Sequence, residues 1–184
     1  MKRHIAVVVA LILSSHSNAA LVERDLWTLG DARITFDWIS GLDWLDVTAT
    51  LNQSWDTVKN RLVSGGDLDG FRLATIQELS QFLDQAGIIQ SNFTPADWGE
   101  KQNMISLFSL IGATNPELHI TEARYDAPTQ FGNTHNIWKL NYSPNGQSTT
   151  SYDNGYTEDS SSTGDLRRGS FLVRTSPIPI PATA

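Results

Sequence analysis

The chain has 184 residues, and its 13 Lys and Arg against 20 Asp and Glu give a formal net charge of −7. It contains no cysteine, which excludes disulfide bonds, thiolate metal sites, iron–sulfur clusters and a cysteine nucleophile. The acidic balance argues against a nucleic-acid partner, because phosphate binding requires clustered Lys and Arg. Hydrophobic residues make up 40% of the chain, which is ordinary for a globular protein large enough to bury a core.

The first twenty residues have the layout of a secretory signal peptide. A basic start precedes an unbroken apolar run at 5–13, and Ser17-Asn18-Ala19 fits the small-x-small rule for cleavage. We expect cleavage after Ala19 or Ala20, which leaves 11 basic and 20 acidic residues and a net charge of −9. The alternative is an N-terminal membrane anchor, but a bilayer-spanning helix needs about 20 apolar residues.

The segment after the signal peptide is predicted to form extended structure. Apolar and polar residues alternate over 26–29 and 32–38, on either side of Gly30-Asp31, which is typical of a β-hairpin with a tight turn. A further extended piece is expected over 42–47 after the break at Ser40-Gly41.

Three of the six tryptophans, Trp27, Trp38 and Trp44, fall in this first quarter of the chain. Tryptophan usually buries most of its ring and keeps one polar tip for a hydrogen bond. Core packing is therefore the expected role of all three. The alternative is a platform on which sugar rings stack.

Two helices have clear start signals. The first is expected over 52–63, with Ser54 as its N-cap. The second starts with a capping box, in which the Thr75 hydroxyl and the Glu78 carboxylate each accept a backbone N–H of the other residue. Apolar residues then recur at i, i+3, i+4 and i+7, and Gly87 stands where a left-handed residue ends a helix.

The second half of the chain has weaker signals. The remaining regular elements are expected at 100–111 (a helix) and at 118–125, 137–142 and 170–174 (strands). The segment 141–169 is rich in Ser, Thr, Asn, Gly and Asp, which predicts a long surface loop with a short strand near 152–156.

Several motifs follow one another in a characteristic order. They are GLDWLD at 41–46, SW at 54–55, GFRLATIQEL at 70–79 and GSFLVR at 169–174. The ordered set resembles the body of exported PEP-CTERM proteins and, more distantly, bacterial Lcl-C-terminal-like domains, over residues 21–175. The resemblance implies an α+β fold of the C-type-lectin-like kind: two or three helices packed on short, mostly antiparallel strands, with long loops and both ends in one sheet.

The expected organisation is a signal peptide at 1–19, a single globular domain at 21–175 and a proline-rich tail at 176–184. In the tail, Pro177, Pro179 and Pro181 fix φ and remove backbone donors, so the segment is extended. It is similar to the start of a PEP-CTERM sorting signal, which implies processing by an exosortase-type enzyme. In that family a hydrophobic helix and a basic cluster follow, whereas this sequence stops first, so surface anchoring and free secretion both stay open.

Motifs of the common catalytic classes are missing from the sequence. His119 or His135 would be the base of a catalytic Asp/His site that no recognised motif marks, but no neighbouring residues in the sequence support this role for either. Asp43 and Asp46 are a poor carboxylate pair, because residues three apart in a strand face opposite ways; we expect Asp46 to cap the chain before the first helix. The formylglycine-generating enzymes of the similar fold need cysteine, and none is present. Together with the missing motifs, this leads us to expect a protein without enzyme activity.

One fragment has a metal-like pattern. Asp67 and Asp69 precede Gly70, and alternate carboxylates before a glycine are how calcium loops begin. The rest of a calcium loop does not follow at the required spacing, so a solvated turn is the other interpretation. The same two interpretations apply to the acidic residues Glu158, Asp159 and Asp165.

The leading hypothesis is a non-enzymatic domain that a bacterium exports through its inner membrane to the cell surface or the extracellular matrix. Its expected partner is an extracellular polysaccharide or a surface protein. The alternatives are a secreted hydrolase with an Asp/His site and a purely structural matrix protein whose negative charge keeps it soluble.

Overall fold

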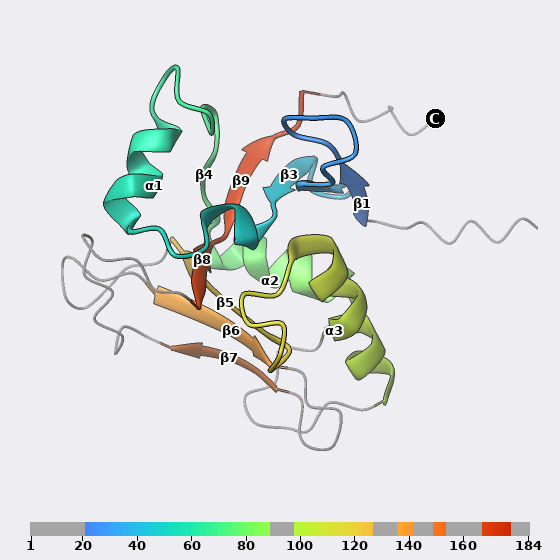
Figure 1. Cartoon of the computed structure of the whole chain (residues 1–184). Coiled ribbons are helices and arrows are strands. Elements are labelled where there is room, and N and C mark those ends of the chain that lie inside the picture. Colours follow the sequence, from blue (N-terminus) through green and yellow to red (C-terminus); the bar gives the residue numbers. More distant parts are fainter. Residues whose placement is uncertain (1–20, 89–97, 127–135, 142–148, 154–166, 178–184) are drawn as a thin grey trace, which may run out of the picture.

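The computed structural model describes residues 21–88, 98–126, 136–141, 149–153 and 167–177. These parts form helices beside two sheets (Figure 1), so the predicted α+β class with mostly antiparallel strands is confirmed. The helices are α1 (Trp55–Leu62), α2 (Ile76–Gln85), α3 (Trp98–Ile111) and the 3-10 helix η1 (Val47–Thr50). The strands are β1 (Leu21–Arg24), β2 (Ile34–Asp37), β3 (Leu42–Leu45), β4 (Arg72–Leu73), β5 (Ile120–Tyr125), β6 (Asn136–Asn141), β7 (Thr149–Asp153), β8 (Arg168–Ser170) and β9 (Leu172–Thr175).

The first sheet has the strand order β1-β2-β3-β9-β4, and every neighbouring pair in it is antiparallel. The last described strand therefore lies inside the sheet, between β3 and β4. Arg24 of β1 donates from Nη1 to Ser176 Oγ at 3.1 Å, and the Ser176 N–H donates to the Gly41 carbonyl at 2.9 Å. The two ends of the described chain thus meet at one sheet.

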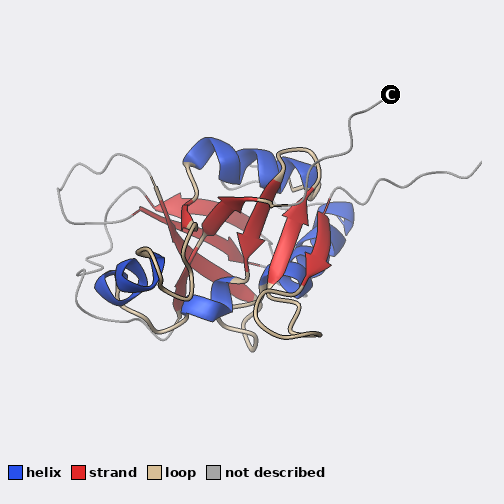
Figure 2. Cartoon of the chain, turned by 90° about the horizontal axis from the view of Figure 1, so that it is seen from above, coloured by secondary structure: helices blue, strands red, loops and turns tan. Residues whose placement is uncertain are grey.

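Helices cover both faces of the first sheet (Figure 2). On one face, Ile34, Leu45 and Leu172 pack with Val58 of α1 and with Phe71 from the loop that follows this helix. Strand residues alternate between faces, so the neighbours of these residues belong to the opposite side. This first face carries the smaller of the two hydrophobic clusters.

The main core lies on the opposite face. Trp44 and Val173 of the sheet pack there with Phe82 of α2, Leu107 of α3 and Tyr125 of the second sheet. The cluster therefore joins the first sheet, two helices and the second sheet into one packed body, in which every residue of β2 and β3 is buried.

The second sheet has the order β7-β6-β5-β8, in which β5 and β8 are parallel and the other pairs antiparallel. Phe171 connects it to the first sheet, because its N–H donates to the Arg124 carbonyl and its carbonyl accepts the Ala74 N–H, both at 2.8 Å. Gly169, just before, approaches η1 so closely that a Cβ would collide with the Val47 carbonyl oxygen. The final strands therefore tie both sheets together.

The predicted helix signals are confirmed. Ser54 Oγ accepts the Thr57 N–H at 3.1 Å. Thr75 Oγ1 accepts the Glu78 N–H at 3.2 Å, and the Thr75 N–H donates to Glu78 Oε2 at 2.9 Å, which completes the capping box. Gly87 follows α2 with a φ of 70°. Local chemistry is sufficient to predict these ends.

The predicted hairpin is wrong in its first strand. β2 pairs with Leu21–Arg24 and not with 26–29. The Asp31 carboxylate accepts the backbone N–H groups of residues 26–28, which therefore cannot donate to a neighbouring strand. Residues 25–33 form a loop, which we call the Trp27 loop.

Smaller differences concern the second half. The expected final strand is two strands, interrupted at Phe171 where the chain passes between the sheets. The short strand expected near 152–156 is β7 at Thr149–Asp153, and the flanking segments 142–148 and 154–166 lie outside the described residues. Within the described ranges, no helix has the length and apolar character that crossing a membrane requires.

Candidate functional site

The three tryptophans of the first quarter differ in exposure. Trp44 is 1% exposed and stacks on Phe82 with ring centroids 4.2 Å apart, so core packing is confirmed for this residue. Trp27 and Trp38 are 45% and 36% exposed, and core packing is wrong for both. Trp27 lies in a loop, and Trp38 lies in the turn after β2. A sugar ring is able to stack only on an exposed aromatic ring, so these two are the candidates.

Trp38 belongs to a packed aromatic group. Its ring meets Phe36 edge to face, with centroids 4.8 Å apart. The Arg24 guanidinium lies 3.5 Å from the Phe36 centroid and 5.7 Å from that of Trp38, a cation–π arrangement. The Trp38 ring thus lies at the partly exposed edge of this aromatic group. Trp27 belongs to neither of the two hydrophobic clusters that the structure describes.

The Trp27 loop is held by two aspartates. Asp31 accepts four backbone N–H groups, from Leu26 at 2.9 Å, Trp27 at 2.8 Å, Thr28 at 2.9 Å and Arg33 at 3.3 Å. The carboxylate of Asp25 accepts a fifth, from residue 32, at 3.0 Å. The side chain of Leu26 packs against the small cluster under α1. The loop therefore has a defined conformation before any ligand arrives.

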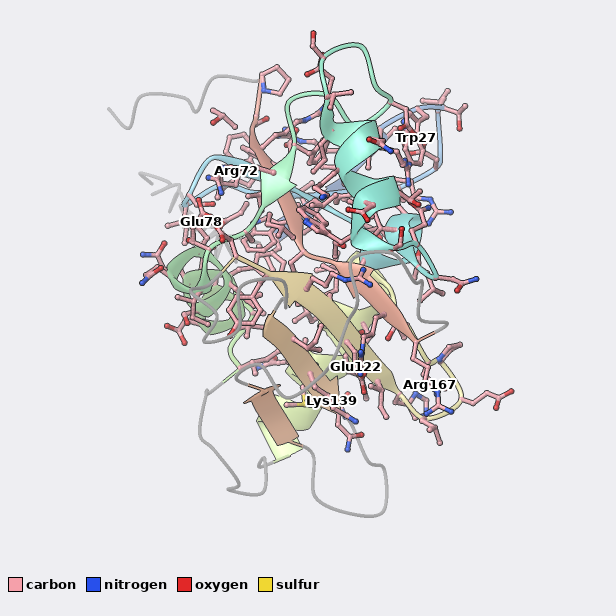
Figure 3. All side chains as sticks on the ribbon, turned by 90° about the vertical axis from the view of Figure 1, so that its left-hand side faces the viewer. Trp27, Arg72, Glu78, Glu122, Lys139 and Arg167 are labelled. Carbon is pink, nitrogen blue, oxygen red and sulfur yellow. The ribbon has the colours of Figure 1, made fainter. Side chains whose placement is uncertain are left out.

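The ring of Trp27 is placed by contacts with α1 and with a second loop, residues 63–70, which follows this helix. Its Nε1–H donates to the Asp67 carbonyl at 3.4 Å, and the Arg61 guanidinium lies 6.0 Å from the ring centroid. Figure 3 shows Trp27 at the end of the molecule that holds α1. The polar edge of the ring is used for positioning, and nearly half of its surface still faces solvent.

Two carboxylates of these loops, Asp31 and Asp67, have lowered pKa values. Desolvation opposes ionisation of Asp31, but the N–H groups of Leu26, Thr28, Trp27 and Arg33 outweigh it and lower the pKa of Asp31 to about 2. The Arg61 guanidinium, through its hydrogen bonds, lowers the pKa of Asp67 as well. The Asp31 and Asp67 carboxylates therefore keep their negative charge in mild acid.

The predicted calcium residues have partners within the chain. Both Asp67 oxygens accept from Arg61, from Nε at 3.0 Å and from Nη2 at 2.7 Å, and Asp69 Oδ2 accepts the Gly65 N–H at 3.0 Å. In the described ranges, no group of three or more Asp, Glu or His side chains gathers in a metal-binding arrangement. Calcium binding at Asp67 and Asp69 stays a prediction, now next to an ion pair that already occupies Asp67.

Asp43 and Asp46 serve separate structural purposes. Asp43 is buried and contacts two guanidinium groups, Arg174 Nε at 3.1 Å and Arg24 Nη1 at 3.6 Å. Asp46 caps η1, since its Oδ1 accepts the Thr48 N–H at 2.8 Å, as the sequence predicts. The two carboxylates have different partners and do not form an acid–base pair.

The other residues singled out in the sequence fall partly outside the described ranges. His119 precedes β5 with a φ of 51°, and Pro177 is the last described residue. The residues outside are Ala19, Ala20, His135, Glu158, Asp159, Asp165, Pro179 and Pro181.

Sequence reasoning missed Asp31 and Arg61, which position Trp27. The Gly30-Asp31 pair is recognisable as a turn, but the alternation around it suggests strands and hides the role of the carboxylate. Arg61 lies on the polar side of an amphipathic helix, where a solvated charge is the ordinary expectation. Its contacts with the second loop are set by the tertiary fold.

Comparisons of the chain with models of protein families, with curated proteins and with solved structures found no match.

Proposed function

We propose that this chain is an exported, non-enzymatic domain that binds polysaccharide, with the Trp27 ring as the surface on which a sugar stacks. The observation that carries the proposal is a ring 45% exposed although its N–H and its loop are already fixed by hydrogen bonds. An aromatic side chain offers a large rigid contact area at a low cost in entropy. A preorganised loop adds to this, because little has to be ordered on binding.

The wider proposal includes a C-type-lectin-like arrangement and a place at the cell surface or in the matrix. It is supported by the meeting of both described ends at one antiparallel sheet, by the signal-peptide pattern at 1–19 and by the proline-rich tail at 176–184. An exosortase-type enzyme is the proposed processing partner. Sequencing of the native N-terminus tests the location: we expect Ala20 or Leu21 in the surface or medium fraction, and an uncleaved cytoplasmic protein would contradict it.

Binding is tested with the chain lacking residues 1–19, by affinity electrophoresis and by sedimentation with polysaccharides of different chemistry, including the exopolysaccharide of the source cells. Replacement of Trp27 by Ala is expected to weaken binding about 30-fold, since truncating a central aromatic anchor costs about 2 kcal/mol. Replacement by Phe keeps a stacking surface but loses the N–H to Asp67, so an intermediate loss is expected.

Leu29 provides the matched control, because it lies in the same loop and is 100% exposed. Its replacement by Ala is expected to change binding less than about twofold, as contacts outside an anchor contribute little. Equal losses for Leu29→Ala and Trp27→Ala would show non-specific apolar adhesion. Thermal unfolding of each variant excludes global unfolding as the cause of any loss. No binding of any polysaccharide would reject the proposal.

A further inference from the structure

One row of side chains crosses four strands of the first sheet. The register pairs Val22 with Phe36, Phe36 with Asp43 and Asp43 with Arg174, and paired residues point to the same face of a sheet. Ile34, two residues before Phe36 on β2, belongs to the neighbouring row, which packs under α1. The first row, which we call the Asp43 row, therefore lies on the face that α1 covers, one step away from the contacts with this helix.

Two guanidinium groups shield the buried residues of the Asp43 row. The Arg24 guanidinium lies 3.5 Å from the Phe36 ring centroid, and its Nη1 lies 3.6 Å from Asp43 Oδ1. Arg174 donates from Nε to Asp43 Oδ2 at 3.1 Å, and its guanidinium lies 4.5 Å from the Phe71 ring centroid. The side chains of the two arginines are 20% and 26% exposed, whereas that of Asp43 is 4% exposed. Two cations thus share one buried carboxylate and reach the surface beside it.

Both guanidinium groups keep donors that the chain does not use. A guanidinium offers several N–H donors in a fixed planar fork. Within the described residues, Arg24 donates only from Nη1, to Ser176 Oγ at 3.1 Å, and Arg174 donates only from Nε, to Asp43. The buried polar atoms that have no hydrogen-bond partner in this part of the chain include Asp43 Oδ1 but no nitrogen of either arginine. The unused donors therefore face solvent, and the contact between Arg24 and Asp43 holds no hydrogen bond that a ligand would have to break.

An exposed aromatic ring lies beside these donors. The Trp38 ring is 36% exposed, and its centroid lies 5.7 Å from the Arg24 guanidinium. Its edge-to-face contact with Phe36 fixes its position before a ligand binds. A guanidinium fork binds a carboxylate through two parallel hydrogen bonds, and an exposed indole offers a rigid stacking surface. A sugar residue that carries a carboxylate fits both groups at once.

The local charge is opposite in sign to the charge of the whole chain. Without residues 1–19 the chain has a net charge of −9, whereas Arg24 and Arg174 against Asp43 leave one positive charge at this place. The Debye length is about 8 Å at physiological ionic strength, so exposed acidic groups farther away repel an anion only weakly. The Asp43 row is thus a place where an acidic chain is able to hold an anionic group.

We infer that Arg24, Arg174 and Trp38 form a second binding site, which takes a carboxylate-bearing sugar such as a uronic acid residue of an acidic polysaccharide. The sugar ring stacks on Trp38, and its carboxylate accepts hydrogen bonds from the unused donors of the two arginines. This inference rests on the proposed function in naming a polysaccharide as the ligand, but the site shares no residue with the Trp27 loop.

The test uses the chain lacking residues 1–19 and calorimetry at pH 7 and 0.15 M NaCl. It compares a uronic acid oligomer with a neutral sugar oligomer of equal length. We expect the uronic acid oligomer to bind about 10-fold tighter, because charge-assisted hydrogen bonds are the stronger ones. Arg24→Lys keeps the charge but loses the fork, and should reduce this preference about fivefold. Trp38→Ala should weaken binding of the uronic acid oligomer about 10-fold.

Arg72→Lys is the matched control. Arg72 lies on β4 at the other edge of the same sheet, and its fork is engaged by Glu78 at 2.8 Å and 2.6 Å. Its replacement should change the preference less than about twofold. Equal reductions for Arg24→Lys and Arg72→Lys would show general attraction to basic groups and overturn the inference. Urea unfolding of each variant identifies any loss that comes from unfolding, and Arg24→Lys and Trp38→Ala test the site by separate routes.

The Trp27→Ala variant separates this inference from the proposed role of Trp27. A preference for the uronic acid oligomer that is unchanged in Trp27→Ala supports the second site, and a preference that survives Trp38→Ala overturns it. Equal binding of the two oligomers that depends on Trp27 leaves the proposed function standing and rejects the inference. Binding of the uronic acid oligomer that depends on Arg24 and Trp38 but not on Trp27 supports the inference and rejects the role of Trp27. Binding of neither oligomer rejects both.

Discussion

Glu78→Gln perturbs the capping box at the start of α2. Arg72 donates to both carboxylate oxygens of Glu78, at 2.8 Å and 2.6 Å, and the two side chains face each other on the surface in Figure 3. The Arg72 hydrogen bonds are the main cause that lowers the pKa of Glu78 from 4.5 to about 2; desolvation opposes them and Thr75 assists them. Gln keeps the size and a capping oxygen but removes the charge.

The expected loss of stability follows from the pKa shift of Glu78. At about 1.4 kcal/mol per pKa unit, this shift corresponds to about 3 kcal/mol of folding free energy. The Arg72 side chain is 53% exposed, so solvent screens the pair and we expect about 1.5 kcal/mol to remain. The folded pKa lies below the unfolded one, so this stability is complete above pH 4.5 and is lost as the pH falls toward 2. Between pH 7 and pH 3, about 1 kcal/mol of it disappears.

Urea unfolding followed by tryptophan fluorescence measures the effect. Glu78→Gln is expected to lower the free energy of unfolding by about 1.5 kcal/mol at pH 7 and by about 0.5 kcal/mol at pH 3. Asp84→Asn is the control, an exposed acid on the same helix, and should show no such pH dependence. An equal loss for Glu78→Gln at both pH values would refute the reasoning.

Two further predictions concern other carboxylates. Asp43→Ala leaves the Arg24 and Arg174 guanidinium groups without their shared partner, so we expect a loss of about 3–5 kcal/mol in urea unfolding; a loss below about 1 kcal/mol would mean that water replaces the carboxylate. Asp31→Asn releases backbone N–H groups of the Trp27 loop, and should weaken polysaccharide binding as much as Trp27→Ala while the circular dichroism spectrum is unchanged. Because the pKa of Asp31 is about 2 against an ordinary 3.8, loop order in the wild type should decline only as the pH falls below 3.8. Normal binding by Asp31→Asn would show that this carboxylate does not order the loop.

How far the sequence predicts the structure depends on the range of the interaction. The caps at Ser54, Thr75 and Gly87 depend on neighbours a few residues away, and the sequence predicts them. The exposure of Trp27 does not follow in this way, because the same alternation of apolar and polar residues suits a strand. The exposure of this ring depends on the Asp31 carboxylate, which accepts hydrogen bonds from several backbone N–H groups, and on contacts with a loop 40 residues later.

The position of β9 was also beyond local reasoning. The pattern over 170–174 predicts a strand, but it contains no sign of the break at Phe171 or of a place between β3 and β4. The break follows from the Phe171 hydrogen bonds to Arg124 and Ala74, and the place of β9 follows from its pairing with β3 and β4, all far away in the chain. Sequence periodicity gives the type of an element and leaves its neighbours undetermined.

The central place of β9 has a consequence for the time at which the protein becomes folded. Asp43 of β3 and Arg174 of β9, which pair within the first sheet, are 131 residues apart. Long-range strand pairings of this kind form slowly, and here the sheet is incomplete until almost the last described residue has emerged. If the chain is exported as proposed above, N-terminus first through a narrow channel, its first sheet is completed only after β9 has reached the far side.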